Sequence, residues 1–179
     1  TSHDLDHWWC RFGLSLAGMV LGAVVAHGAT LTCYQKIERV PLRESAPIVE
    51  LHFGLPAGLL DAIRFEETGE TWNVRALGTQ GEVGPYQIMP ATVAEIKSIK
   101  LHLMSDAAVK MLLNRIEREL YDGRANTCWA GRILRDLRDK ACGGNIACAI
   151  AGFTAGGRKA RYTGRVLKWL TEVETASAR

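Results

Sequence analysis

Residues Leu55–Thr92, LPAGLLDAIRFEETGETWNVRALGTQGEVGPYQIMPAT, decide how the fold of this chain is interpreted. The stretch begins with apolar residues, runs into a pair of acids and a glycine-rich loop, and ends where Pro90 is placed to open a new helix. Leu59, Ile63 and Glu67 recur at every fourth position, so in a helix they share one side. Because two of the three are apolar, that side is predicted to face the core.

Glu67 is predicted to lie in the last turn of this helix, because Gly69 is placed to end it. The negative end of the helix dipole and the neighbouring apolar surface both disfavour the ionised carboxylate. A raised pKa suits a general acid that works near neutral pH. From these residues alone, however, a solvated pair of acids, Glu66 and Glu67, is the more common arrangement.

The loop makes the interpretation more specific. Ala62-Ile63, then Glu67-Thr68-Gly69, then Gly81, Gly84, Gln87, Met89, Pro90 and Thr92 stand in order and at a fitting distance. Over about Ser45 to Leu170 the chain resembles the soluble (SLT) type of lytic transglycosylase, a relative of goose-type lysozyme. The resemblance implies a mainly α, lysozyme-like domain with at most a minimal β element, in which Glu67 is the catalytic acid and base and Gln87 binds sugar.

Later parts of the chain depart from the family pattern. Phe153 and Thr154 stand where relatives have a tyrosine, whose hydroxyl orients the catalytic glutamate, and an asparagine. Either Tyr86 or Tyr162 is then expected to supply the missing hydroxyl, or the acid is held less well. The resemblance also implies that substrate contacts come from residues around Glu67, namely Thr68, Tyr86, Gln87, Met89, Phe153, Thr154 and Tyr162.

The implied reaction cuts the β-1,4 bond between MurNAc and GlcNAc in peptidoglycan with a single glutamate and leaves a 1,6-anhydro-MurNAc end. A lysozyme-type hydrolase instead needs a second carboxylate, for which Glu70 and Glu82 are the candidates in the loop. A wall-binding or structural protein that keeps the fold without turnover is the remaining alternative. The same domain would serve a conjugation or secretion apparatus, a phage or virion, or wall remodelling.

The N-terminal residues contain the longest apolar run. Residues 12–26 carry no charge, and Trp8 and Trp9 extend the run toward membrane-spanning length. We therefore divide the chain into a hydrophobic helix that acts as signal or anchor (residues 1–29), a charged linker (30–44) and the catalytic domain (45–179). Membrane contact is expected through residues 8–28, with the domain in the periplasm, exported or anchored in the inner membrane, or else associated with a virion.

Cysteines and charge narrow the chemistry. Four cysteines follow the apolar run and are compatible with two disulfides in an oxidising compartment, Cys33, Cys128, Cys142 and Cys148, of which Cys142 and Cys148 flank a short loop. No cysteine or histidine spacing is that of a zinc site, and no cofactor is expected. The net charge of +3 is compatible with an anionic wall polymer and does not indicate nucleic-acid binding.

Helical periodicity covers most of the remaining chain. We expect helices from Ser45 to His52, from Pro90, from Ser105 to Tyr121, from Thr127 to Lys140, from Asn145 to Ala155 and from Tyr162 to Val173. The alternation of Trp72, Val74 and Ala76 with polar neighbours would allow one brief strand.

Overall fold

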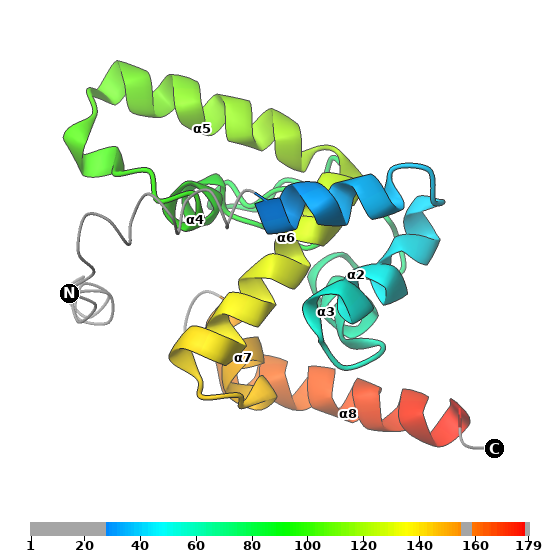
Figure 1. Cartoon of the computed structure of the whole chain (residues 1–179). Helices are drawn as coiled ribbons and strands as arrows, with labels where there is room; N and C mark the ends of the chain where they lie inside the picture. Colours follow the sequence, from blue (N-terminus) through cyan, green and yellow to red (C-terminus); the bar gives the residue numbers. More distant parts are fainter. Residues whose placement is uncertain (1–27, 155–158, 178–179) are drawn as a thin grey trace.

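A computed structural model describes residues 28–154 and 159–177, and it is mainly helical as predicted (Figure 1). After a helix over residues 28–37, the elements run η1 (Leu42–Glu44), α2 (Ser45–Phe53), α3 (Leu59–Thr68), α4 (Pro90–Ile96), η2 (Leu101–Leu103), α5 (Asp106–Leu120), α6 (Gly123–Asp136), the π-helical turn η3 (Leu137–Ala141), α7 (Ile146–Phe153) and α8 (Lys159–Ser177). The predicted hydrophobic helix of residues 12–26 lies outside the described residues.

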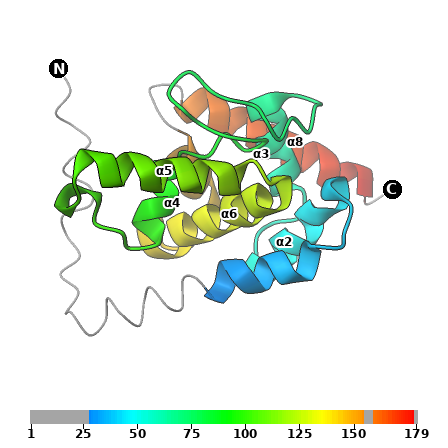
Figure 2. The ribbon, with the colours of Figure 1, turned by 90° about the horizontal axis from the view of Figure 1, so that it is seen from above.

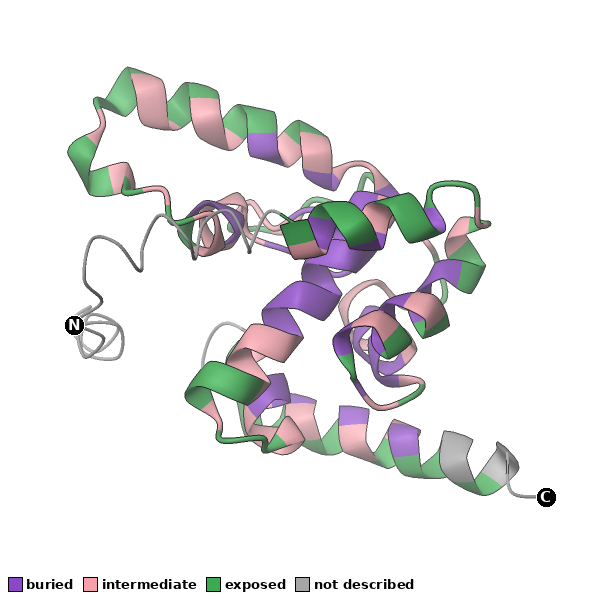
Figure 3. Cartoon of the chain, in the orientation of Figure 1, coloured by how far each residue is buried: buried purple, intermediate pink, exposed green. Residues whose placement is uncertain are grey.

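Helix α6 is the centre of the domain. Its residues from Ala125 to Leu134 are all buried, and it packs against α2, α3, α5 and α7 (Figures 1 and 3). Gly131 permits the close contact with α2, because a Cβ at this position would stand 2.6 Å from a methyl group of Val49. By contrast, α5 lies across the outside of the domain and is largely exposed (Figures 2 and 3).

Side chains at the helix ends explain where several helices begin. Ser105 accepts a hydrogen bond from the Ala108 amide at the start of α5, and Asn145 accepts one from Cys148 at the start of α7. Asp122 follows the predicted helix end at Tyr121, and its carboxylate accepts from the amides of Arg124 and Ala125. It therefore opens α6, which begins four residues before the predicted Thr127.

Helix α2 begins at Ser45 as predicted, and the Ser45 hydroxyl donates to the Leu42 carbonyl. Two other local predictions need correction. Residues Trp72–Ala76 form turns and no strand, and β pairing in the described chain is limited to the isolated bridges Leu77–Val83 and Val83–Ile88. Helix α8 begins at Lys159, before the predicted Tyr162.

The predicted linker, residues 30–44, is in fact part of the packed domain. Cys33 and Ile37 are buried in the core, and Cys33 forms a disulfide with Cys128 of α6. The Arg124 guanidinium donates to the carbonyls of Ile37 and Val40, and Tyr34 donates to Asp122 at 2.8 Å. Residues 28–37 thus belong to the domain. The sequence suggested a linker because the segment contains many charged residues. In the structure these residues are exposed, whereas one side of the short helix packs into the core.

The second disulfide, Cys142–Cys148, closes the short loop between η3 and α7. All four cysteines proposed for disulfides are therefore paired. Among the described helices, none combines the length and the apolar character that crossing a membrane requires.

Candidate active site

Helix α3 places Glu67 as the sequence predicted. Leu59 and Ile63 are fully buried, and Glu67 follows them in the last turn, half-buried. Gly69 ends the helix with a φ of +68°, which favours glycine. The Arg64 guanidinium donates to the Gly69 carbonyl at 2.8 Å and stacks over the Trp72 ring at 4.6 Å. The end of α3 and the start of the loop are therefore fixed together.

The Glu67 carboxylate is held by a tyrosine of α8. The Tyr162 hydroxyl donates to Glu67 Oε1 at 2.7 Å, and Tyr162 is itself buried. This is the only hydrogen bond of Glu67 among the described residues, so Oε2 remains available to a ligand. Of the two tyrosines considered for this contact, Tyr162 makes it.

Burial raises the pKa of Glu67 above its ordinary value, and the negative charges of Glu82 and Glu66 raise it further. The hydrogen bond from Tyr162 acts in the opposite direction, because it favours the ionised carboxylate. Burial and the neighbouring Glu67 also raise the pKa of Tyr162, so its hydroxyl keeps the proton that it donates. Glu67 thus combines a raised pKa, a fixed orientation and one oxygen that no described residue hydrogen-bonds.

Asn126 of α6 holds the glycine-rich loop in place through hydrogen bonds to its backbone. This fully buried side chain accepts from the Tyr86 amide at 3.1 Å and donates to the carbonyls of Val83 (2.9 Å) and Leu120 (3.1 Å). Gly84 lies directly against it, since a Cβ there would stand 2.4 Å from Asn126 Nδ2. Any side chain at position 84 would displace the amide that shapes the loop.

Gln87 and Glu82 come together at the surface of this loop. Gln87 has a φ of +48°, a strained conformation for a residue other than glycine, and its Nε2 donates to the Gly84 carbonyl at 2.8 Å. The Gln87 Oε1 and a Glu82 carboxylate oxygen both lie within 3 Å of the point where a Cβ of residue 78 would stand. Gly78 therefore leaves room for these two polar groups.

The two candidate second carboxylates differ in position. Glu82 is half-buried, accepts a hydrogen bond from the Gln80 amide at 2.9 Å, and is close enough for its charge to raise the pKa of Glu67. Glu70 is exposed, just past the end of α3, and is not among the charges that act on Glu67. If a second carboxylate takes part, the geometry favours Glu82.

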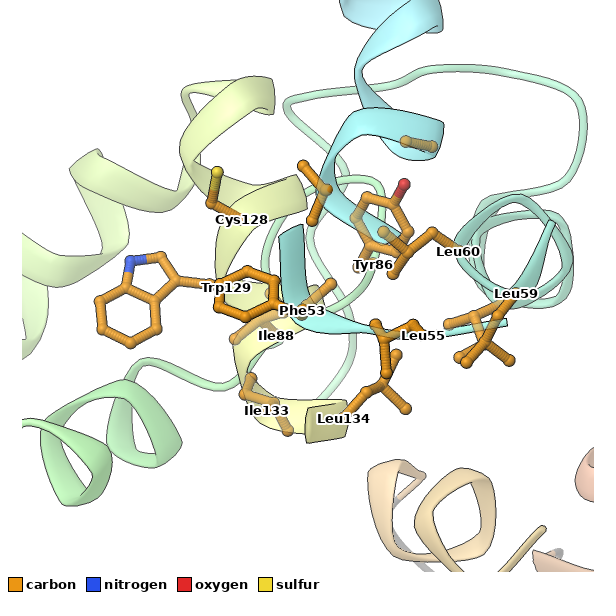
Figure 4. Close-up of a cluster of buried hydrophobic side chains, with 14 of the residues drawn as sticks. Phe53, Leu55, Leu59, Leu60, Tyr86, Ile88, Cys128, Trp129, Ile133 and Leu134 are labelled. Carbon is orange, nitrogen blue, oxygen red and sulfur yellow. The ribbon is translucent and has the colours of Figure 1, made fainter. Parts of the chain in front are cut away.

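Other predicted substrate contacts fall elsewhere. Tyr86 is fully buried in the core cluster, where Figure 4 shows it near Leu60, and it meets Trp72 edge-on, so it cannot contact a substrate. Thr68 has the Pro85 carbonyl within hydrogen-bonding distance at 3.1 Å and thereby joins α3 to the loop. The prediction that Tyr86 contacts substrate is therefore wrong, because this residue belongs to the core. Thr68 directly follows Glu67 and is half-buried, and its role in substrate binding stays a prediction.

The remaining predicted contacts lie at helix ends. Met89 caps the start of α4, Phe153 is the last residue of α7 and packs against the core, and Thr154 follows it. All three are half-buried. Neither Phe153 nor Thr154 hydrogen-bonds Glu67.

Two supporting residues were not predicted to act at the site, Arg64 and Arg165. Arg165 of α8 pairs with Glu66 at 2.5 Å, one turn after Tyr162. The spacing of Tyr162, Arg165 and Trp169 indicates that they share one side of a helix. The sequence does not indicate that this side packs against α3.

A hollow of about 750 Å³ lies away from Glu67. It is bounded by the helix of residues 28–37, by the segment after α4, and by α5 and α6, with Tyr34, Leu112, Ile116 and Trp129 in its wall. No residue of α3 or α8 lines it. The described part of the chain also holds no group of three or more acidic, histidine or cysteine side chains placed to bind a metal ion.

Comparisons of the chain with protein-family models, with curated proteins and with solved structures gave no match.

Proposed function

We propose that this protein is a peptidoglycan lytic transglycosylase with a lysozyme-like fold and Glu67 as its acid and base. The observation that carries the proposal is the half-buried Glu67 carboxyl, held through one oxygen by Tyr162 at 2.7 Å and with its pKa raised by burial. Its position at the end of an apolar helix, before a loop that carries Gln87, adds to the motif resemblance. The two disulfides favour action in an oxidising compartment such as the periplasm.

In the proposed reaction, protonated Glu67 gives its proton to the glycosidic oxygen as the C–O bond breaks. The N-acetyl group of the same MurNAc stabilises the positive charge at the anomeric carbon. Glu67, now ionised, removes the proton from the 6-hydroxyl, and that oxygen closes the 1,6-anhydro ring. Tyr162 holds the carboxyl in place throughout, and Gln87 is positioned to contact the sugar.

One observation favours a second candidate, a lysozyme-type hydrolase. Glu82 is near enough to Glu67 for its charge to act on the acid, so it could instead orient a water molecule for attack. The two reactions differ in their products, which makes them separable.

The test is mass spectrometry of the fragments that the chain releases from purified sacculi, with Glu67→Gln as the matched control. Anhydro ends that the Gln variant does not produce are the expected result. Fragments with reducing ends would instead identify a lysozyme-type hydrolase, with Glu82 as the candidate second carboxylate. Binding to sacculi without any fragments would leave a wall-binding protein.

A further inference from the structure

A small charged hollow adjoins Glu67 on the side of α8. It measures about 210 Å³ and is lined by one residue of α3 and four of α8, namely Glu66, Arg165, Lys168, Trp169 and Glu172. Glu66 directly precedes Glu67 in α3, and Arg165 follows Tyr162 by one helical turn. The hollow therefore lies one residue along α3 and one turn along α8 from the contact between Glu67 and Tyr162.

Successive turns of α8 build this hollow. Tyr162, Arg165, Trp169 and Glu172 recur at three- and four-residue spacing, which places them along one side of the helix. The first turn brings the Tyr162 hydroxyl to Glu67, and the second brings Arg165 to Glu66. The following turns extend the same row away from Glu67, with the half-buried Trp169 as its apolar part.

The cations of the hollow keep binding capacity. Arg165 is half exposed and uses its Nε on Glu66, whereas a guanidinium has four further N–H groups that suit a carboxylate. The Lys168 side chain is 78% exposed and lies 3.8 Å from Glu172, a weak ion pair. An anionic group can therefore be bound without breaking a buried contact.

We propose that this hollow binds a free carboxylate of the peptide stem that hangs from the glycan strand. The inference rests on the proposed function, because a strand held at Glu67 carries its stems past the neighbouring surface. Four of the five lining residues are charged, two acidic and two basic, which suits a peptide stem with both carboxylate and amine groups better than the neutral sugars of the strand. Arg165 and Lys168 bind the stem carboxylate, and Trp169 supports the apolar part of the stem.

The experiment compares two substrates, intact sacculi and glycan strands from which an amidase has removed the stems. The variants are Arg165→Gln/Lys168→Gln, the single Lys168→Gln, and the control Lys100→Gln/Lys110→Gln, which removes two exposed charges from other elements. We expect kcat/KM of the first double variant on stem-bearing substrate to fall about tenfold through KM. The stem-free activity of Lys168→Gln, and both activities of the control, should stay unchanged. The double variant, which also removes the Arg165–Glu66 pair, should lose a larger factor on the stem-bearing substrate than on stem-free strands.

Two kinetic results would overturn the proposal: equal losses on both substrates, or no loss on either. Lys168→Gln should show a smaller, stem-dependent loss, and it leaves the Arg165–Glu66 pair in place. If the wild-type chain cuts neither substrate, the proposed function fails separately. Calorimetry with a soluble disaccharide-peptide then tests stem binding without catalysis. Binding by the wild-type chain that the double variant loses would support the hollow as a stem site, and no binding would contradict it.

Discussion

A carboxyl group lies near each end of helix α3, and the two groups have different environments. Glu50 of α2 lies at its start, 3% exposed, and accepts from the amides of Gly58 (2.9 Å) and Leu60 (2.7 Å), one on each oxygen. Glu67 lies at its end with one oxygen bound by Tyr162 and the other without a hydrogen bond to any described residue. Burial raises the pKa of both groups, that of Glu50 to about 7.

The comparison shows that a raised pKa does not identify a catalytic carboxyl. Glu50 satisfies two amides that would otherwise be orphaned at the start of α3, and no oxygen is left for a ligand. Glu67 is half-exposed and partly satisfied. We propose that hydrogen-bond saturation and solvent access distinguish the structural acid, Glu50, from the proposed catalytic acid, Glu67, and the predictions below test this distinction.

The largest expected effect is on stability. Replacing Glu50 with Ala leaves the buried amides of Gly58 and Leu60 without an acceptor and opens a cavity, which should lower the free energy of unfolding by about 4 kcal/mol. Denaturant unfolding at pH 5 measures it. The exposed Glu44→Ala is the matched control and should change stability by less than about 0.5 kcal/mol. Equal effects of the two variants would contradict the role given to Glu50.

The pH dependence of stability should also carry the signature of Glu50. Its pKa rises from 4.5 in the unfolded chain to about 7 in the folded one, so the folded state binds the extra proton between these values. Stability from this group is present below pH 4.5 and is lost as pH rises toward 7, by about 3 kcal/mol. Unfolding curves across this range should lose that slope in Glu50→Gln. An unchanged slope would show that Glu50 does not titrate there.

The sequence predicts the C-terminal end of α3, where Glu67 lies, but not the environment of Glu50 at its N-terminal end. The Leu59, Ile63, Glu67 spacing and Gly69 gave the last turn, because those signals are local. No local sequence signal indicates the role of Glu50, because its amide partners lie eight and ten residues later and its burial depends on how α2 packs against α3.

Contacts distant in sequence were equally hidden. Tyr162 lies 95 residues from Glu67, so only the packing of α8 on α3 brings it there. The motif could nominate Tyr162 or Tyr86, but deciding between them required knowing that Tyr86 is in the core. Residues 30–44 were predicted to be a linker for the same reason, since the disulfide partner of Cys33 lies 95 residues away.

A smaller effect is expected from Tyr162→Phe. Losing the hydroxyl removes a hydrogen bond that lowers the pKa of Glu67, so the alkaline limb of the pH–activity profile should move to higher pH. The less well oriented acid should also reduce kcat about tenfold, equivalent to about 1.4 kcal/mol. Rates of sacculus cleavage across pH provide both readings. A limb that moves to lower pH would contradict the assigned contact.

The smallest effect is expected from Glu82→Gln. Removing this charge should lower the pKa of Glu67 and move the same limb to lower pH, opposite to Tyr162→Phe. The rate at the optimum should change by about threefold or less. Glu70→Gln, which removes an exposed charge from the same segment, is the control and should leave the profile in place. A far larger loss with Glu82→Gln would favour the hydrolase and a direct catalytic role for Glu82.

The most direct test compares Glu67→Gln with Glu50→Gln at equal concentrations of folded protein, measuring the initial rate of sacculus cleavage. We predict that Glu67→Gln unfolds like the wild type but cuts at least about 1,000-fold more slowly. Glu50→Gln should be less stable yet cut at close to the wild-type rate. The reverse pattern, with cleavage retained by Glu67→Gln and lost by folded Glu50→Gln, would contradict the assignment of Glu67 as the catalytic acid.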